Sequence, residues 1–336
     1  MTELDSISAY SLFPDKNGMW VTGDDCSAIC VQYGMRPRVV FSPQYEVDYG
    51  EHSFASDKFS LTAKSLKTAV DLVEPEEPSR DDLLLAHDPV WTDKVLSGKL
   101  SAFDVSRLEL PFSSEISLAH RLGVGGTVLA ARHALEAGIG LHCGGGAHHA
   151  FRDHGEGYCA LNDIAIAILK LRAEKKLERA AVIDLDVHQG NGTASIFKGD
   201  GNVFTFSMHQ SDLYPEAKEK SSLDVELRAG TGDVEYYDIL RRSLRTVFEF
   251  KPDLVIYQSG VDVWEHDALG GLKLTERGIL DRDTAVWETC LMHRVPVVVT
   301  LGGGYGPTPQ DTARLHARTL SLFAGLPLTS TSSDQS

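Results

Sequence analysis

Short apolar segments alternate with helical segments along most of this 336-residue chain. Apolar strands that alternate with helices indicate a parallel sheet that is covered by helices on both faces. The expected strands cover residues 37–43, 139–143, 180–188, 202–209, 253–260 and 295–304. Helical spacing predicts helices at 63–73, 117–138, 161–179 and 234–250. The pattern therefore predicts an α/β fold of three layers, α/β/α, around a central, mainly parallel sheet.

The chain shows no internal repeat and no internal linker, so we expect one folded domain over residues 37–325. Residues 1–36 read as an N-terminal extension. Residues 326–336, which include the stretch LTSTSSDQS, have the composition of a disordered tail.

The formal net charge of −16 comes from 32 basic and 48 acidic residues. Such a surface disfavours direct binding of nucleic acid, whose phosphates require Lys and Arg, and is compatible with a cationic peptide or amine. The five cysteines are an odd number in a long chain, which argues against a disulfide framework. We find neither a signal-peptide pattern at the N-terminus nor an apolar run long enough to span a membrane, and we expect a cytoplasmic protein.

The stretch DLDVHQGNG follows the apolar residues 181–183 and places Asp184, Asp186 and His188 at alternate positions. On a strand, alternate side chains point to one face. Two carboxylates and an imidazole near a buried strand end are costly unless something compensates their charge and lost hydration. A metal cation is the simplest compensation, so this stretch predicts a metal site.

Other expected strands also end in polar side chains. His148 and His149 follow the strand at 139–143, Asp262 follows 253–260, and Tyr305 follows 295–304. Each of them alone has an ordinary structural explanation, such as a helix cap or a turn. In open parallel sheets, however, ligands bind beyond the carboxyl ends of the strands. We therefore expect these groups to form one active site.

The motifs GGGAHH, GYCALNDIAIA, DLDVHQGNGT, SGVDVWEHDALGGL and LGGGYG occur in this order and at compatible spacing. Together they resemble the histone deacetylase superfamily, which also contains acetylpolyamine amidohydrolases and acetoin-utilisation proteins. The resemblance covers roughly residues 37 to 325, and HQGNG and DALGGL look most like its class IV branch. It implies the arginase/deacetylase-like fold and a zinc-dependent hydrolase that removes acetyl or longer acyl groups from lysine side chains.

The resemblance also implies the catalytic roles. Asp186, His188 and Asp262 would hold one Zn²⁺ per chain, and three protein ligands leave a position open for water and substrate. Asp184 would accept the ring N–H of His148. His149 would take a proton from water and then protonate the leaving amine. Its partner would be Asn191, where many relatives have Asp, and an amide stabilises the imidazolium less well.

Tyr305 would donate its hydroxyl to the substrate carbonyl opposite the zinc. The positions that match the walls and mouth of the family's substrate channel are Gly157, Tyr158, Tyr214, Leu269 and Gly303. A site for a monovalent cation such as K⁺ would involve Asp184, Asp186, His188, Ser207 and Met208. Polyamine-selective relatives have a glutamate at the gate that Leu269 occupies here, so we expect a preference for acyl-lysine peptides.

Three alternatives stay open at this point. A ureohydrolase of the arginase type binds two manganese ions and needs a further carboxylate near the metal site. This sequence has Gly190 and Asn191 where that carboxylate would be expected. A non-catalytic acyl-lysine binder would be expected to lack Tyr305, a zinc ligand or the histidine pair. A deacetylase of acetylpolyamines or of another small amide shares the chemistry and differs only in substrate. The acyl-chain length, the protein target and the oligomeric state do not follow from the residues.

Overall fold

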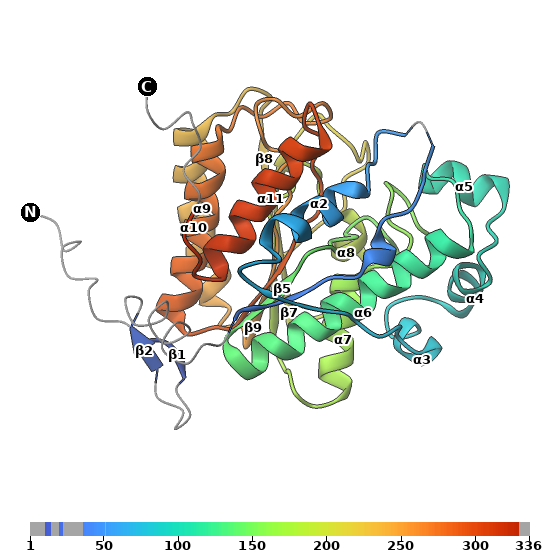
Figure 1. Ribbon diagram of the computed structural model, residues 1–336, viewed down its shortest axis with the longest axis horizontal. Helices are drawn as coiled ribbons and strands as arrows, with labels where there is room; N and C mark the ends of the chain where they lie inside the picture. The colour runs from blue at the N-terminus through green and yellow to red at the C-terminus, as the bar shows by residue number, and fades with distance from the viewer. Residues whose placement is uncertain (1–10, 15–19, 23–35, 51, 329–336) are drawn as a thin grey trace, which may run out of the picture.

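A parallel sheet of eight strands forms the centre of the computed structural model, which describes residues 11–14, 20–22, 36–50 and 52–328 (Figure 1). Every pair of neighbouring strands in this sheet is parallel, and their order is β4-β3-β5-β10-β9-β6-β7-β8. The strands are β3 (Arg38–Val40), β4 (Asp71–Val73), β5 (Ile139–His142), β6 (Ala180–Asp184), β7 (Val203–Gln210), β8 (Leu223–Leu227), β9 (Leu254–Gln258) and β10 (Val297–Thr300).

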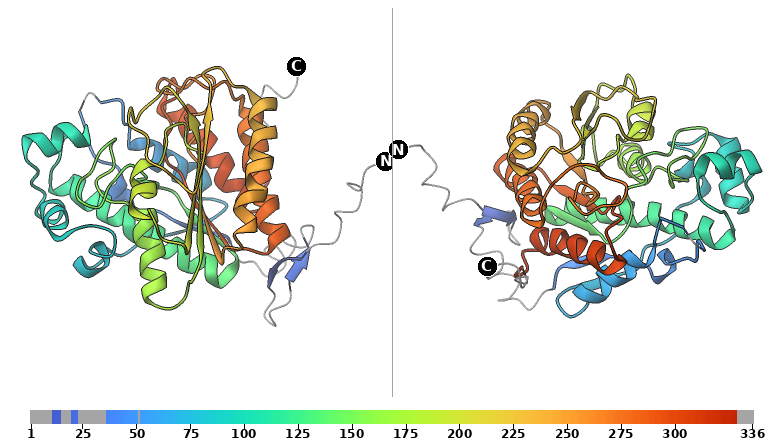
Figure 2. Two further views of the ribbon diagram at one scale, coloured as in Figure 1. Left: turned by 180° about the vertical axis from the view of Figure 1, so that it is seen from behind. Right: turned by 90° about the horizontal axis from the view of Figure 1, so that it is seen from above.

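Helices cover both faces of the sheet, as the edge-on view shows (Figure 2, left). One face carries α2 (Asp57–Leu66), α9 (Asp233–Glu249), α10 (Glu276–His293) and α11 (Pro309–Phe323). The other face carries α3 (Arg80–Leu83), α4 (Pro89–Ser97), α6 (Ser114–Ala137) and α7 (Asp163–Ala173). The remaining elements are the helices η1 (Pro43–Tyr45), α5 (Ala102–Leu108) and α8 (Asn191–Ile196) and the antiparallel pair β1 (Ser11–Pro14) and β2 (Trp20–Thr22). The predicted three-layer α/β/α class is confirmed.

The central strands are buried on both faces, and their residues alternate between two cores. In β6, Ala181 and Ile183 pack into the core beside α9, α10 and α11, whereas Ala180 and Val182 pack into the core beside α6 and α7. This is the period-2 alternation of a strand, with apolar residues on both faces because helices cover both. It explains why the central strands read as continuous apolar runs.

Two of the differences from the expected elements change the sheet or the argument for the site. The segment 63–73 is not one helix, because α2 ends at Leu66 and the chain turns back there through hydrogen bonds from Ala69 N and Val70 N to the Leu66 carbonyl. Asp71–Val73 then pairs with β3 as an edge strand. The strand expected over 180–188 ends at Asp184, so the alternation argument does not hold for Asp186 and His188. Their side chains gather through the turn that follows β6.

Part of the N-terminal extension and residues 329–336 of the expected tail lie outside the described residues. No helix in the described ranges is both long and apolar enough to cross a membrane.

Candidate active site

Four neighbouring strands bring the expected site residues to one edge of the sheet. β5, β10, β9 and β6 lie side by side in this order. The histidine pair follows β5, Tyr305 follows β10, Asp262 follows β9, and Asp186 and His188 follow β6. Because parallel strands end at the same edge, residues far apart in the sequence meet there. Gly303 N, for example, donates to Asp186 Oδ2 at 2.8 Å across a separation of 117 residues.

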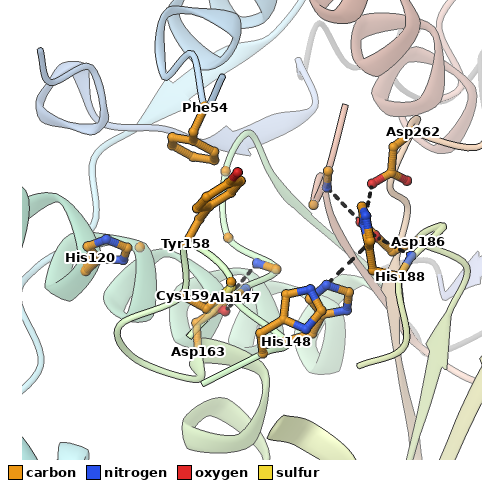
Figure 3. Close-up of a pocket in the computed structure, with 18 of the residues that line it drawn as sticks. Phe54, His120, Ala147, His148, Tyr158, Cys159, Asp163, Asp186, His188 and Asp262 are labelled. Carbon is orange, nitrogen blue, oxygen red and sulfur yellow. Dashed lines mark hydrogen bonds and ion pairs between the residues drawn. The ribbon is translucent and has the colours of Figure 1, made fainter. Parts of the chain in front are cut away.

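Asp186, His188 and Asp262 form a compact group in which one potential ligand atom of each lies within 4.8 Å of the others (Figure 3). Asp186 Oδ1 accepts hydrogen bonds from the backbone N–H and from Nδ1 of His188, at 3.0 and 3.1 Å. Asp262 Oδ1 accepts the N–H of Val187 at 2.9 Å, and its Oδ2 lies 3.3 Å from His188 Nδ1. Both carboxylates are thus oriented by backbone amides and lie against the imidazole.

This group fits a divalent cation. Asp262 Oδ2 is buried and has no hydrogen-bond partner in the described part of the chain, which is costly for a carboxylate oxygen. Burial and the neighbouring Asp186 raise the pKa of Asp262 to about 7. Burial lowers the pKa of His188, but the two carboxylates outweigh burial and raise it to about 10. The site therefore attracts positive charge, and two carboxylates with one imidazole suit zinc.

The tandem histidines lie in different electrostatic environments. His148 Nδ1 donates to Asp184 Oδ2 at 2.7 Å, and His149 Nδ1 lies 2.7 Å from Asn191 Oδ1. Burial lowers the pKa of His148, but the carboxylates of Asp184 and Asp186 raise it to about 9. Burial and the neighbouring imidazole of His148 lower the pKa of His149 well below its usual range. His149 is therefore the neutral member of the pair and the one able to accept a proton.

Tyr305 is fixed through its backbone and its ring, which leaves its hydroxyl available. Its N–H donates to Asp267 Oδ2 at 2.6 Å, and its ring lies 6.3 Å from the Tyr158 ring and 5.3 Å from Lys58 Nζ. Burial, followed by the charge of Asp262, raises the pKa of Tyr305 well above its usual range. The hydroxyl consequently keeps its proton and can act as a donor.

A cavity of about 360 Å³ opens onto this group of residues. The histidine pair, the carboxylate–imidazole group and Tyr305 line this cavity. It is also lined by all the expected channel residues, which are Gly157, Tyr158, Tyr214, Leu269 and Gly303. Gly157 adopts φ +53°, and a Cβ there would lie 2.7 Å from His149 Cδ2. At Gly303, a Cβ would collide with Asp262 Oδ2. Glycine at these two positions allows the backbone to approach the reactive groups closely.

Comparison with known families identifies the chain. The model of the histone deacetylase domain matches residues 52–321, which is most of the sequence. The chain belongs to the histone deacetylase family.

Related proteins carry several names within this family. An uncharacterized protein of Picosynechococcus sp. is 39% identical over 83% of this chain and 95% of its own length. Histone deacetylase 2 of Arabidopsis thaliana is 32% identical over 80% of this chain and 74% of its own length. The acetoin utilization protein AcuC of Bacillus subtilis is 32% identical over 70% of this chain and 68% of its own length. The relatives support hydrolysis of amides.

A solved structure described as the HDA15 HD domain shares the fold, with a TM-score of 0.70 and 22% sequence identity. The match covers 88% of this chain and 90% of that chain.

Several side chains that support the histone deacetylase site were not expected from the sequence. Lys58 on α2 is 1% exposed and donates to the carbonyl of Gly302 at 3.0 Å, although it lies 244 residues away in the sequence. Asp163 at the start of α7 accepts the N–H groups of Gly146 and Ala147, just before the histidine pair, at 2.9 and 2.7 Å. Lys58 had no sequence signal. Asp163 lies within the motif GYCALNDIAIA, but only the folded chain shows which backbone it holds.

Asp267 and Glu156 were also missed, although both lie close to the quoted motifs. Asp267 is a further aspartate within SGVDVWEHDALGGL, and Glu156 directly precedes GYCALND. Asp267 holds the backbone of Tyr305, and Glu156 accepts a hydrogen bond from Asn191. Asn191 was expected to orient His149, but no sequence signal indicated what orients Asn191 itself.

Proposed function

We propose that this chain is a zinc-dependent hydrolase that removes acyl groups from lysine side chains. The observation that carries the proposal is the buried group of Asp186, His188 and Asp262, whose Asp262 Oδ2 lacks a hydrogen-bond partner among the described residues. This group faces the same cavity as His149 and Tyr305. A metal site, a neutral base and a hydroxyl donor around one cavity are the parts that metal-assisted amide hydrolysis needs.

Zinc held by these three residues would polarise the substrate carbonyl and lower the pKa of a water molecule. His149, as the neutral histidine, would take a proton from that water as its oxygen attacks the carbonyl carbon. His148, whose pKa the carboxylates of Asp184 and Asp186 raise to about 9, would stay protonated and supply a fixed positive charge. When the C–N bond breaks, His149 returns the proton to the leaving amine. The products are a free lysine side chain and a carboxylate.

Tyr305 would stabilise the negative charge that develops on the carbonyl oxygen. Its raised pKa keeps the hydroxyl protonated, and the hydrogen bond from its backbone to Asp267 fixes its position. A donor held in place before the reaction does not have to reorganise when the charge appears. Tyr158 and Tyr214 line the cavity with aromatic rings that would pack against the methylene chain of an acyl-lysine.

A hydrolysis panel tests the proposal. Acetyl-, octanoyl- and myristoyl-lysine peptides would be compared with N-acetylputrescine while the zinc content of the protein is measured. We expect release of carboxylate from at least one acyl-lysine peptide by protein that contains about one zinc per chain. Two metal ions per chain, or tight binding of acyl-lysine without turnover, would contradict the proposal and favour the arginase-type or the binding-protein alternative respectively.

A small acylated polyamine is a second candidate substrate. Glu109 is an exposed acidic residue that lines the cavity, and a carboxylate at this place could pair with a distal ammonium group. Leu269, at the position expected to act as the gate, also lines the cavity and is half-buried. A Glu109→Gln variant in the same panel measures how much Glu109 contributes to the use of N-acetylputrescine.

We predict that Leu269→Glu moves the preference of the enzyme from acyl-lysine peptides toward N-acetylpolyamines. The new carboxylate would pair with the second nitrogen of a polyamine, which an apolar gate leaves unpaired. The ratio of the two kcat/KM values should change by at most about 1.5–3 kcal/mol, the range of a hydrogen bond to a charged group. Leu269→Gln, which has a similar size and no charge, is the control and should change the ratio much less. A wild-type enzyme that is faster on N-acetylputrescine than on every acyl-lysine peptide would contradict the expected substrate class.

We also propose a monovalent cation near the site, as the family resemblance suggests. Ser207 on β7 lies opposite Asp184 on β6 in the strand register, with Met208 next along the strand. This arrangement supports a shared site, which a comparison of activity in K⁺ and in Na⁺ would test. The class IV assignment remains a prediction, and the panel above measures the preferred acyl-chain length, which the residues do not determine.

A further inference from the structure

The side-chain amide of Asn191 is held at both of its ends. Its Oδ1 lies 2.7 Å from His149 Nδ1 and also accepts the N–H of Gly192 at 3.0 Å. Its Nδ2 donates to Glu156 Oε1 at 2.6 Å. Asn191 therefore links the histidine that we propose as the base to a carboxylate outside the cavity lining.

Glu156 is itself held by several polar groups. The Tyr214 hydroxyl donates to the same Oε1 at 2.8 Å, while Oε2 lies 3.4 Å from His154 Nε2 and 3.7 Å from Arg107 Nε. Burial raises the pKa of Glu156, but the close contact with His154 and the hydrogen bonds from Tyr214 and Asn191 outweigh burial and lower it. Glu156 is therefore ionised at neutral pH.

An ionised carboxylate only accepts hydrogen bonds, and this property orients the amide beside it. An amide can present either its oxygen or its nitrogen to a histidine, and the two orientations fix opposite tautomers of the ring. With Glu156 accepting from its Nδ2 and the N–H of Gly192 donating to its Oδ1, Asn191 directs its NH₂ group toward the carboxylate and its oxygen toward His149. His149 must then carry its proton on Nδ1, which leaves the lone pair of Nε2 free. An aspartate at position 191 would need no such partner, because both of its oxygens are acceptors.

We propose that Glu156 is a positioning residue that acts through Asn191 to hold His149 in the Nδ1–H tautomer, with Nε2 ready to accept a proton. The inference rests on the proposed function, because the tautomer matters only if His149 is the base. Glu156 also couples the base to the channel wall, since the same Oε1 holds Tyr214.

Two substitutions at position 156 distinguish the effect of the hydrogen-bond acceptor from the effect of side-chain size. Glu156→Gln keeps an oxygen that can accept from both Asn191 and Tyr214, whereas Glu156→Leu keeps approximate size and removes the acceptor. We expect Glu156→Leu to lower kcat about 10- to 100-fold, by analogy with the loss of hydrogen-bond partners that orient metal-binding groups. Glu156→Gln should keep most of the activity. Arg107→Gln removes an exposed group 3.7 Å from the other carboxylate oxygen and is the matched control, with kcat close to that of the wild type.

A charge exchange gives a sharper test. Asn191→Asp alone would place two carboxylates against each other where a 2.6 Å hydrogen bond now lies, so kcat should fall. In the double variant Asn191→Asp/Glu156→Gln, the NH₂ of the new amide at position 156 can donate to the new carboxylate at position 191 and to the oxygen of the Tyr214 hydroxyl, which lies against the same atom, and kcat should recover. A residue that served only to fill space would not produce this reversal. Equal losses in the single and the double variant would overturn the inference.

The tautomer can also be observed without a substrate. In full-length, zinc-loaded protein with ¹⁵N-labelled histidine, the His149 resonances, assigned with a His149→Phe variant, should show a proton on Nδ1. In Glu156→Leu, this signal should weaken or the tautomer should change, while in Glu156→Gln it should persist. An unchanged Nδ1–H signal and an unchanged kcat in Glu156→Leu would refute the role of Glu156. If no acyl-lysine peptide is hydrolysed by the wild type, the proposed function fails, and the spectra still decide whether Glu156 orients the pair.

Discussion

Asp262→Ala should lose its zinc and its hydrolase activity. The change removes one of the three proposed metal ligands, and it removes the oxygen that has no hydrogen-bond partner in the described structure. Zinc content should fall from about one per chain to nearly none, because two ligands hold the ion too weakly to survive dialysis. Activity should then fall to the background level on every substrate of the panel.

The same variant separates loss of metal from loss of folding. Ligands that bind only the folded state stabilise it, so added zinc should raise the Tm of the wild type and should leave that of Asp262→Ala nearly unchanged. In the absence of metal, the substitution removes the repulsion between the carboxylates of Asp262 and Asp186. This repulsion and burial together raise the pKa of Asp262 to about 7. The substitution also leaves the N–H of Val187 without its acceptor, and this cost opposes the gain.

Glu265→Ala, on the same loop, is the matched control because it removes a partly exposed carboxylate outside the proposed ligand group. It should retain both zinc and activity. Full zinc retention by Asp262→Ala would show that the metal assignment is wrong.

Tyr305→Phe should lower kcat about 10²–10³-fold, which corresponds to roughly 2.7–4 kcal/mol for the loss of one donor to a developing oxyanion. KM should change little, because the hydroxyl is expected to bind the transition state more strongly than the bound substrate. The measurement is steady-state kinetics on the best acyl-lysine peptide, with the zinc content determined in parallel.

This substitution should leave the fold intact. The backbone of Tyr305 donates to Asp267 and accepts from the N–H of Ala268, and the aromatic contacts to Tyr158 and Lys58 need only the ring. An unchanged Tm and an unchanged zinc content are therefore the internal controls. Turnover close to that of the wild type would remove Tyr305 from the proposed chemistry.

Local sequence patterns were sufficient to predict a helix where its ends and its apolar face depend only on its own residues. The helix expected at 117–138 is α6, which begins after the side-chain cap of Ser113 and ends at Gly138 with a left-handed backbone. Capping residues and apolar periodicity are encoded in adjacent residues, so they can be read without the fold. The prediction failed at 63–73, where pairing of Asp71–Val73 with β3 overrides the helical spacing. That pairing depends on a strand 33 residues earlier.

The sequence by itself determined the fold class, the order of the motifs and which candidate reactive side chains follow the strands. These features depend on apolar periodicity and on the kinds of residue that follow each strand. Tertiary structure decided which strands are neighbours, where β6 ends, and how the cavity is lined. It also decided the partners of the reactive groups, such as Lys58 under the loop of Gly302 and Glu156 behind Asn191. A hydrogen bond between distant residues forms only once the chain has folded, and for this reason the sequence could name the proposed base but not the carboxylate that we propose to orient its partner.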